Sequence, residues 1–145
     1  MIRSTAGIAG LLAAACVGCS PSQRNEDFIP SEAAARSALE AHLRAWQGGD
    51  TSQQVPGTNP PVLVADGLRA KGRPLAGYEV LGPVPADAPR CFAVRLTLGN
   101  PREEVRERYV VVGADPVWVW RYDDYLTVIH WEHPMPEKKA TPPKK

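Results

Sequence analysis

His42 is the residue of this sequence whose type and position most directly suggest chemistry. It lies one turn before Trp46 on the apolar side of a predicted helix, so its imidazole would point into the fold. Asp50 follows that helix and could orient the ring, and a histidine paired with a carboxylate can act as a general base. Tyr109 or Tyr122 could approach from a predicted sheet. We favour the simpler interpretation, a core histidine bonded to a backbone carbonyl and to water.

Two further candidates for chemistry carry weaker signals. His130 and His133 lie three residues apart in the sequence HWEH, a spacing that resembles a metal motif. On a strand, residues three apart face opposite sides, and zinc would need a third ligand, so we predict no metal site and no cofactor. Cys91 is the only cysteine beyond the N-terminal leader, which leaves no partner for a disulfide within the mature chain. We interpret it as a small buried hydrophobic residue.

The N-terminal stretch has the composition of an export signal. Residues 1–19 contain one basic residue, Arg3, and then an apolar run that is too short to span a bilayer as a mature helix. The sequence VGCS resembles the lipobox of bacterial lipoproteins, in which a cysteine receives diacylglycerol and becomes the new N-terminus. Cys19 is the predicted lipidation site, and Cys16 is the alternative. The remaining possibility is an exported protein that is cut by the ordinary signal peptidase and carries no lipid. Ser20 resembles the outer-membrane-directed case, so we expect an outer-membrane lipoprotein facing the periplasm.

Length and charge restrict the domain organisation and the partners. A chain of 145 residues with 43% hydrophobic content can bury one core of ordinary size. We predict a signal peptide over 1–19, a tether over 20–30, a single domain over 31–133 and a disordered tail over 134–145. Loss of the signal peptide removes Arg3 and no acidic residue, which leaves 16 basic and 16 acidic residues. A neutral chain without clustered basic residues is not expected to bind nucleic acid.

A single amphipathic helix should position His42. Ser31 is a favourable N-cap, and Gly48 with Gly49 supplies the left-handed residue that commonly ends a helix. The apolar stripe of this helix comprises Ala35, Ala38, Leu39, His42, Leu43 and Trp46. A loop follows over residues 50–61, and the pattern of residues 62–73 fits either a short strand or a broken helical turn.

About four antiparallel strands should form the sheet. One is predicted over 75–82, and three more follow between Arg90 and Tyr122, where apolar residues alternate with others and turns intervene. The clearest alternation is that of Phe92, Val94, Leu96 and Leu98.

The last of these strands should have two apolar faces. Trp118, Trp120 and Tyr122 share one face, and valines line the other, so a helix on one side leaves the second side uncovered. We expect residues 125–133 to cover it as a fifth strand or a strap, ahead of a homodimer partner or a ligand stacked on the indoles.

The order of these elements resembles that of the NTF2-like superfamily, also called SnoaL-like or cystatin-like. The likeness covers about residues 31–122 and rests on ALEAHLRAWQGGD at the end of the helix and on VWVWRYDDY at the last strand. It implies an α+β fold in which an N-terminal amphipathic helix packs on a curved antiparallel sheet. In that family the concave space is a ligand pocket, an active site or simply core. The predicted pocket or interface residues are Trp46, Tyr109, Trp118, Trp120 and Tyr122.

The sequence contains no phosphate loop, nucleophile elbow, paired carboxylates or Cys–His arrangement that would specify a reaction. We therefore expect a lipid-anchored envelope protein that acts as a binding or interaction module. Its partners would be the membrane, through the lipid, and an envelope protein or a second copy of itself, while a small-molecule ligand is not identified. One alternative is a small pocket enzyme of isomerase or dehydratase type that uses His42. Another is a structural homodimer formed through the tryptophan-bearing sheet face.

Overall fold

The computed structural model describes residues 24–132. The predicted signal peptide with Cys16 and Cys19, and the predicted tail over 134–145, lie outside the described residues. In chain order the elements are η1 (Asn25–Phe28), α1 (Glu32–Gln47), β1 (Val62–Ala65), α2 (Gly67–Ala70), β2 (Leu75–Pro83), β3 (Cys91–Leu98), β4 (Glu103–Val112), β5 (Val117–Arg121) and α3 (Tyr122–Glu132). Within residues 24–132 no helix is both long enough and apolar enough to cross a membrane.

Helix α1 forms where the sequence predicts it. The Ser31 hydroxyl accepts a hydrogen bond from the backbone N–H of Ala34 at 3.1 Å, which satisfies one of the free donors of the first turn. Gly49 has a φ of 89°, a left-handed conformation that glycine adopts without strain, and the helix ends just before it. The six residues of the predicted apolar stripe are all buried, so this prediction is confirmed.

The sheet has five strands in the described chain, in the order β1-β5-β4-β3-β2. Strands β2 to β5 form an antiparallel meander, and β1 pairs in parallel with β5, with Val62 opposite Val117. The expectation of about four antiparallel strands is therefore corrected to a mixed sheet of five. The additional strand comes from residues 62–73, which divide into β1 and the one-turn helix α2.

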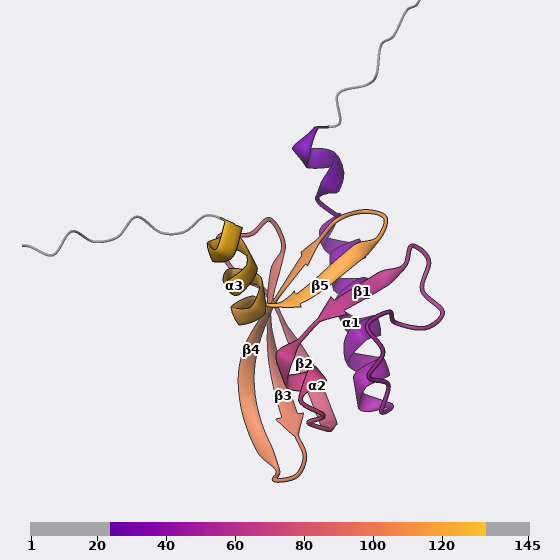
Figure 1. Ribbon diagram of the computed structural model, residues 1–145, viewed down its shortest axis with the longest axis vertical. Coiled ribbons are helices and arrows are strands. Elements are labelled where there is room, and N and C mark those ends of the chain that lie inside the picture. Colours follow the sequence, from indigo (N-terminus) through magenta and orange to yellow (C-terminus); the bar gives the residue numbers. More distant parts are fainter. Residues whose placement is uncertain (1–23, 133–145) are drawn as a thin grey trace, which may run out of the picture.

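Helix α1 covers one face of the sheet and α3 contacts the other, so that the sheet lies between them (Figure 1). The face toward α1 holds the main core, which includes Phe92, Val94, Leu96 and Leu98 of β3 and Val117 and Val119 of β5. The alternation predicted for β3 is confirmed. This burial of contiguous apolar area is the dominant favourable contribution to folding.

The second apolar face is covered by a helix rather than by a strand or an irregular strap. Tyr125 and Leu126 of α3 pack against the buried cluster of Cys91, Val110 and Tyr122. Asp123 and Asp124, which interrupt the strand pattern in the sequence, lie in the first turn of α3, where acidic side chains are favoured by the helix dipole. The cover expected from residues 125–133 is thus present, and its form is helical through residue 132.

The N-terminal segment before α1 also contacts the domain. The backbone carbonyl of Phe28 accepts a hydrogen bond from Gly113 N–H at 2.8 Å, and the carbonyl of Pro30 accepts one from Arg90 Nε at 2.8 Å. The part of the predicted tether that the structure describes, residues 24–30, is therefore attached to the sheet through its last residues.

Candidate functional site

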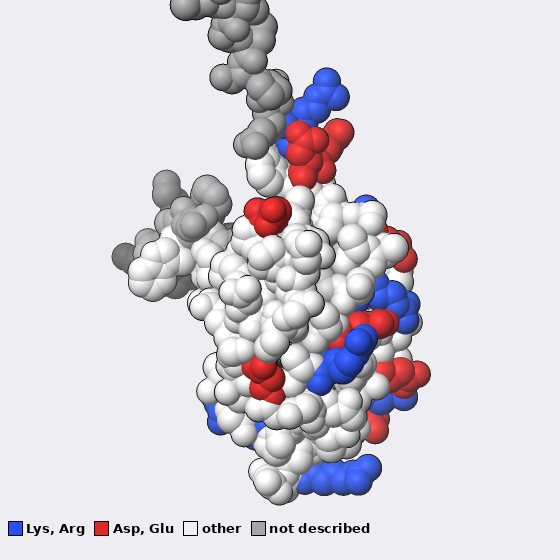
Figure 2. Space-filling model, turned by 90° about the vertical axis from the view of Figure 1, so that its right-hand side faces the viewer, with Lys and Arg blue, Asp and Glu red and all other residues white. Residues whose placement is uncertain are grey.

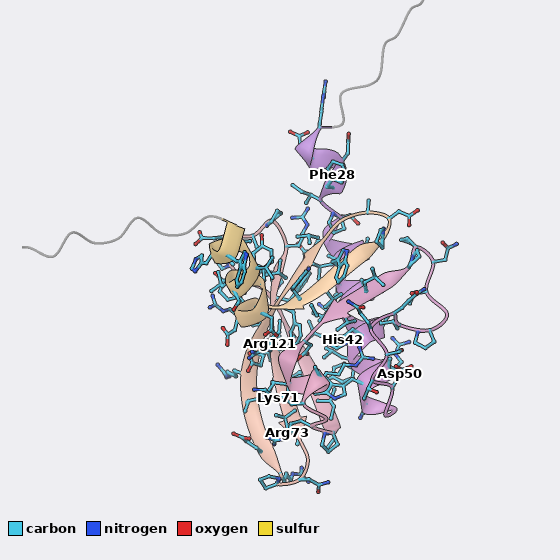
Figure 3. All side chains as sticks on the ribbon, in the orientation of Figure 1. Phe28, His42, Asp50, Lys71, Arg73 and Arg121 are labelled. Carbon is cyan, nitrogen blue, oxygen red and sulfur yellow. The ribbon has the colours of Figure 1, made fainter. Side chains whose placement is uncertain are left out.

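His42 is completely buried on the inner face of α1, between this helix and the sheet (Figure 3). Its Nε2 lies 3.3 Å from Oδ2 of Asp66, the residue between β1 and α2. The hydroxyl of Tyr109, on β4, donates to the same carboxylate oxygen at 2.6 Å. Three segments that are distant in sequence therefore meet at one carboxylate.

Asp66 occupies its position because it caps α2. Its Oδ1 accepts hydrogen bonds from the backbone N–H groups of Leu68 at 2.9 Å and Arg69 at 3.3 Å, the role that aspartate commonly has at a helix N-cap. The other oxygen remains for His42 and Tyr109. One side chain thus connects the start of α2 to the helix α1 and to the sheet.

Arg69 completes the cluster and separates His42 from Asp50. Its Nη1 lies 3.5 Å from Nδ1 of His42, its Nη2 lies 3.2 Å from Oδ1 of Asp50, and its Nε donates to the Asp50 carbonyl at 3.0 Å. The guanidinium is almost entirely buried. The prediction that Asp50 pairs with His42 is therefore wrong. Asp66 is the carboxylate that bonds the histidine, and Asp50 instead neutralises Arg69.

The hydrogen bonds determine the protonation of His42. An arginine can only donate, so Nδ1 of His42 accepts from Arg69, and Nε2 carries the proton that it donates to Asp66. Burial lowers the pKa of His42, and the nearby charge of Arg69 acts in the same direction, whereas Asp66 opposes both. His42 is therefore a neutral imidazole at neutral pH.

Asp66 and Tyr109 have protonation states that match that of His42. Burial by itself would raise the pKa of Asp66, but the hydrogen bonds from His42 and Tyr109 outweigh it, and the pKa of Asp66 is lowered. Burial raises the pKa of Tyr109, and the neighbouring Asp66 carboxylate raises it further. Tyr109 thus stays a neutral donor to an ionised Asp66.

This cluster is closed. Among the described residues, every buried side-chain nitrogen or oxygen has a hydrogen-bond partner. A general base needs a free nitrogen within reach of a substrate, whereas both nitrogens of His42 are engaged and its side chain has no contact with solvent. The cluster therefore fixes α1, α2 and β4 to one another, and His42 has no free nitrogen for a ligand.

An open groove of about 520 Å³ lies beside the cluster, between β1, α2 and α3. It is lined by Thr51, Gln53, Val64, Ala65, Asp66, Gly67, Arg69, Ala70, Trp120, Asp124, Thr127 and Val128. Asp124 shapes this groove, because its Oδ2 accepts from Gly67 N–H at 2.8 Å and from Arg121 Nε at 3.0 Å and so joins α3 to α2. The lining combines apolar side chains with an indole, two hydroxyls, an amide and three charged residues, Asp66, Arg69 and Asp124. A few polar groups among apolar side chains are typical of small-ligand sites.

A second hollow lies on the side of the molecule where the loop between α1 and β1 runs. Figure 2 shows that side, and much of its surface carries no charged side chain. The hollow has a volume of about 360 Å³ and is lined by residues of α1, of the loop and of the start of β1 and β5, all of them uncharged. It provides fewer specific partners for a ligand than the groove beside Asp66.

The five predicted pocket or interface residues do not form one site. Trp46 is buried in the core, where its ring stacks on His42 with centroids 5.9 Å apart and its Nε1 donates to the Arg73 carbonyl at 2.8 Å. Tyr109 belongs to the buried cluster. The other three lie on the opposite face of the sheet.

On that opposite face, Trp118 and Trp120 stack with their ring centroids 5.4 Å apart, as their shared strand face predicts. Tyr122 does not continue the strand, because it is the first residue of α3. Its ring lies under the guanidinium of Arg108 at 3.8 Å, a cation–π contact. Of the three, Trp120 alone lines the groove.

The remaining candidate residues are Cys91, His130 and His133. Cys91 is a free, buried thiol, and burial raises its pKa, which makes it less reactive. No group of three potential ligands among residues 24–132 is placed to hold a metal ion. His130 is exposed on α3, and His133 lies outside the described residues.

Sequence reasoning missed Asp66 and Arg69, which lie 24 and 27 residues from His42. The available signal was local: Asp66 directly follows the apolar run VLVA and precedes a helix-compatible GLRA, which is the pattern of an N-cap. Comparison of the chain with protein-family models, with curated proteins and with solved structures finds no match. The geometry described above is thus what constrains the function.

Proposed function

We propose that this chain is an exported, lipid-anchored protein of the bacterial cell envelope whose domain binds a ligand or partner without catalysing a reaction. The observation that carries the proposal is the closure of the polar cluster beside an open groove. His42, the strongest candidate for catalysis, is neutral, fully buried and bonded at both nitrogens, whereas the groove next to it is accessible.

The fold is compatible with an NTF2-like domain, and we propose that assignment on two features. An N-terminal amphipathic helix packs on one face of a meander of long strands, and the helix ends in the sequence WQGGD. Polar residues of the helix and the sheet, His42 and Tyr109, meet between them. That fold serves enzymes and binding modules alike, so it does not by itself assign an activity.

The anchor rests on the sequence. Cys19 stands between Gly18 and Ser20 at the end of an apolar leader, which supports lipidation there and residence at the periplasmic side of the outer membrane. Attached acyl chains contribute about 0.8 kcal/mol for each buried methylene, so that more than one chain holds a protein stably on a membrane.

One experiment tests both parts of the proposal: the native and denatured intact mass of the full chain extracted from the membranes of a bacterial host. We expect an acylated N-terminus at Cys19 and, under native conditions, an additional bound mass. Cys19→Ser should lose the acyl mass, whereas Cys16→Ser should keep it. Thr127→Trp, which fills the groove, should lose the bound mass and keep the acyl mass.

The two parts can fail separately. An unmodified Cys19 would exclude the anchor at this residue. A chain that carries the acyl group but shows the same native mass in the wild type and in Thr127→Trp would contradict the groove as the binding site.

A further inference from the structure

One end of the molecule exposes aromatic side chains from two segments that flank the loop between β2 and β3. Phe28 of η1 is 48% exposed and Trp131 of α3 is 86% exposed. Residues 84–90, the loop between β2 and β3, connect the two. Arg90 donates to the Pro30 carbonyl, and Ala86 and Ala88 pack in the same cluster as Leu126 of α3. We name Phe28, residues 84–90 and Trp131 the aromatic end.

The two segments that form the aromatic end lie near each other in the fold. Helix η1 and the C-terminal end of α3 lie toward the same end of the domain, which is also where the described chain begins and finishes (Figure 1). Phe28 projects from η1 above the body of the domain (Figure 3). A planar partner could therefore meet both aromatic segments at once.

We infer that the aromatic end rests on the lipid surface to which the chain is anchored, an inference that depends on the proposed lipidation of Cys19. Phe28 lies nine positions after Cys19, and an extended chain of that length spans about 30 Å at most. The anchor would therefore hold Phe28 close to the bilayer. Tryptophan and phenylalanine prefer the membrane interface, where the ring is partly buried among lipid headgroups.

The charges around this end favour aromatic contact over electrostatic attraction as the main source of binding. The chain after Trp131 contains four lysines and two glutamates, and the lysines are attracted to anionic headgroups. Glu26, Asp27 and Asp87 lie on the same end and oppose that attraction. The docking should therefore occur on neutral phosphatidylcholine as well as on anionic lipid.

Quenching of tryptophan fluorescence by brominated phosphatidylcholine tests the inference with the full lipidated chain reconstituted in vesicles. Bromine on the acyl chains quenches only an indole that reaches the bilayer. We expect quenching in the wild type and its loss in Trp131→Phe. The control Trp118→Phe removes an indole of the sheet face and should leave the quenching unchanged. Phe28→Ser should weaken the quenching without abolishing it.

The outcomes separate this inference from the anchor itself. Suppose that the chain floats with the vesicles and carries lipid on Cys19. If the wild type is then not quenched, or if Trp131→Phe is quenched as much as the wild type, the docking surface is overturned and the anchor remains. If the mass shows an unmodified Cys19, the anchor fails. In that case the docking surface stands only if the wild type still floats with phosphatidylcholine vesicles and Trp131→Ser does not.

Discussion

Asp66 is the residue whose carboxylate joins α1, α2 and the sheet in the interior of this protein. It is ionised although it is buried, because it accepts hydrogen bonds from a histidine, a tyrosine and two backbone N–H groups. Such clusters are costly to disrupt, since removal of one donor leaves part of a buried charge unsatisfied. Tyr109 makes the shortest of these contacts, at 2.6 Å.

Substitution of Tyr109 by phenylalanine should therefore lower the free energy of unfolding by about 1.5–3 kcal/mol, the usual range for a hydrogen bond to a charged group. The ring and its packing are kept, so the loss reports the hydroxyl. Urea unfolding followed by circular dichroism measures it. Tyr78→Phe is the matched control, because Tyr78 also packs against the core but no hydrogen bond to its hydroxyl is found within residues 24–132, and it should change stability by less than about 0.5 kcal/mol. Equal effects in the two variants would show that the Tyr109 hydroxyl has no special role.

At the scale of elements, α3 is held to the domain by its first turn and by two half-buried side chains. Asp124 reaches across to the backbone of Gly67 at the start of α2. A methyl group on Gly67 would lie 3.1 Å from the carboxylate, so glycine permits this close approach. The contact fixes the angle of α3 over the groove.

Removal of this contact in Asp124→Ala should loosen α3 selectively. We expect faster amide hydrogen exchange over residues 122–132 and a loss of about 1 kcal/mol in the free energy of unfolding. Asp123→Ala is a matched control: it removes an acid from the same helical turn and a contact with Arg121, but its side chain is 66% exposed. If both variants exchange alike, the bond from Asp124 to Gly67 does not hold the helix.

The helices and strands could be predicted from the sequence where their patterns of apolar residues are regular. The stripe and caps of α1 and the alternation of β3 are strong signals, and both are confirmed. The segment of α3 contains β-branched and aromatic residues without a clear period, so only its packing on the sheet makes it a helix. Within the site, the inward direction of His42 followed from periodicity, and Tyr109 was one of two tyrosines expected to approach it. The pairing with Asp66 did not, because it depends on how a loop returns to the helix.

At the scale of the whole molecule, burial of a neutral histidine makes stability depend on pH. The pKa of His42 is lower in the folded state than its ordinary value of 6.5, so the unfolded chain binds the proton more readily. The contribution of this residue is complete above pH 6.5 and is lost as the pH falls through the folded pKa. Asp66, whose pKa is also lowered, adds a further loss below its ordinary value of 3.8.

The urea midpoint should therefore fall between pH 8 and about pH 5, and His42→Gln, which can still donate to Asp66, should show a smaller fall. Glu107 acts in the opposite direction, because burial raises its pKa and it takes up a proton first in the folded state. The comparison with His42→Gln isolates the histidine from this effect. An identical pH dependence in the wild type and the variant would contradict a neutral His42.

The parallel pairing of β1 with β5 also has a consequence for synthesis of the chain. Val62 and its partner Val117 are separated by 55 residues, and closing so long a loop carries a large entropic cost until the intervening meander has formed. Because β5 lies in the last fifth of the chain, a ribosome must release nearly the whole protein before β1 finds its neighbour. The proposed N-terminal leader would emerge long before that moment. If the chain is exported as we propose, the translocation machinery receives a polypeptide that has not yet been able to complete its sheet.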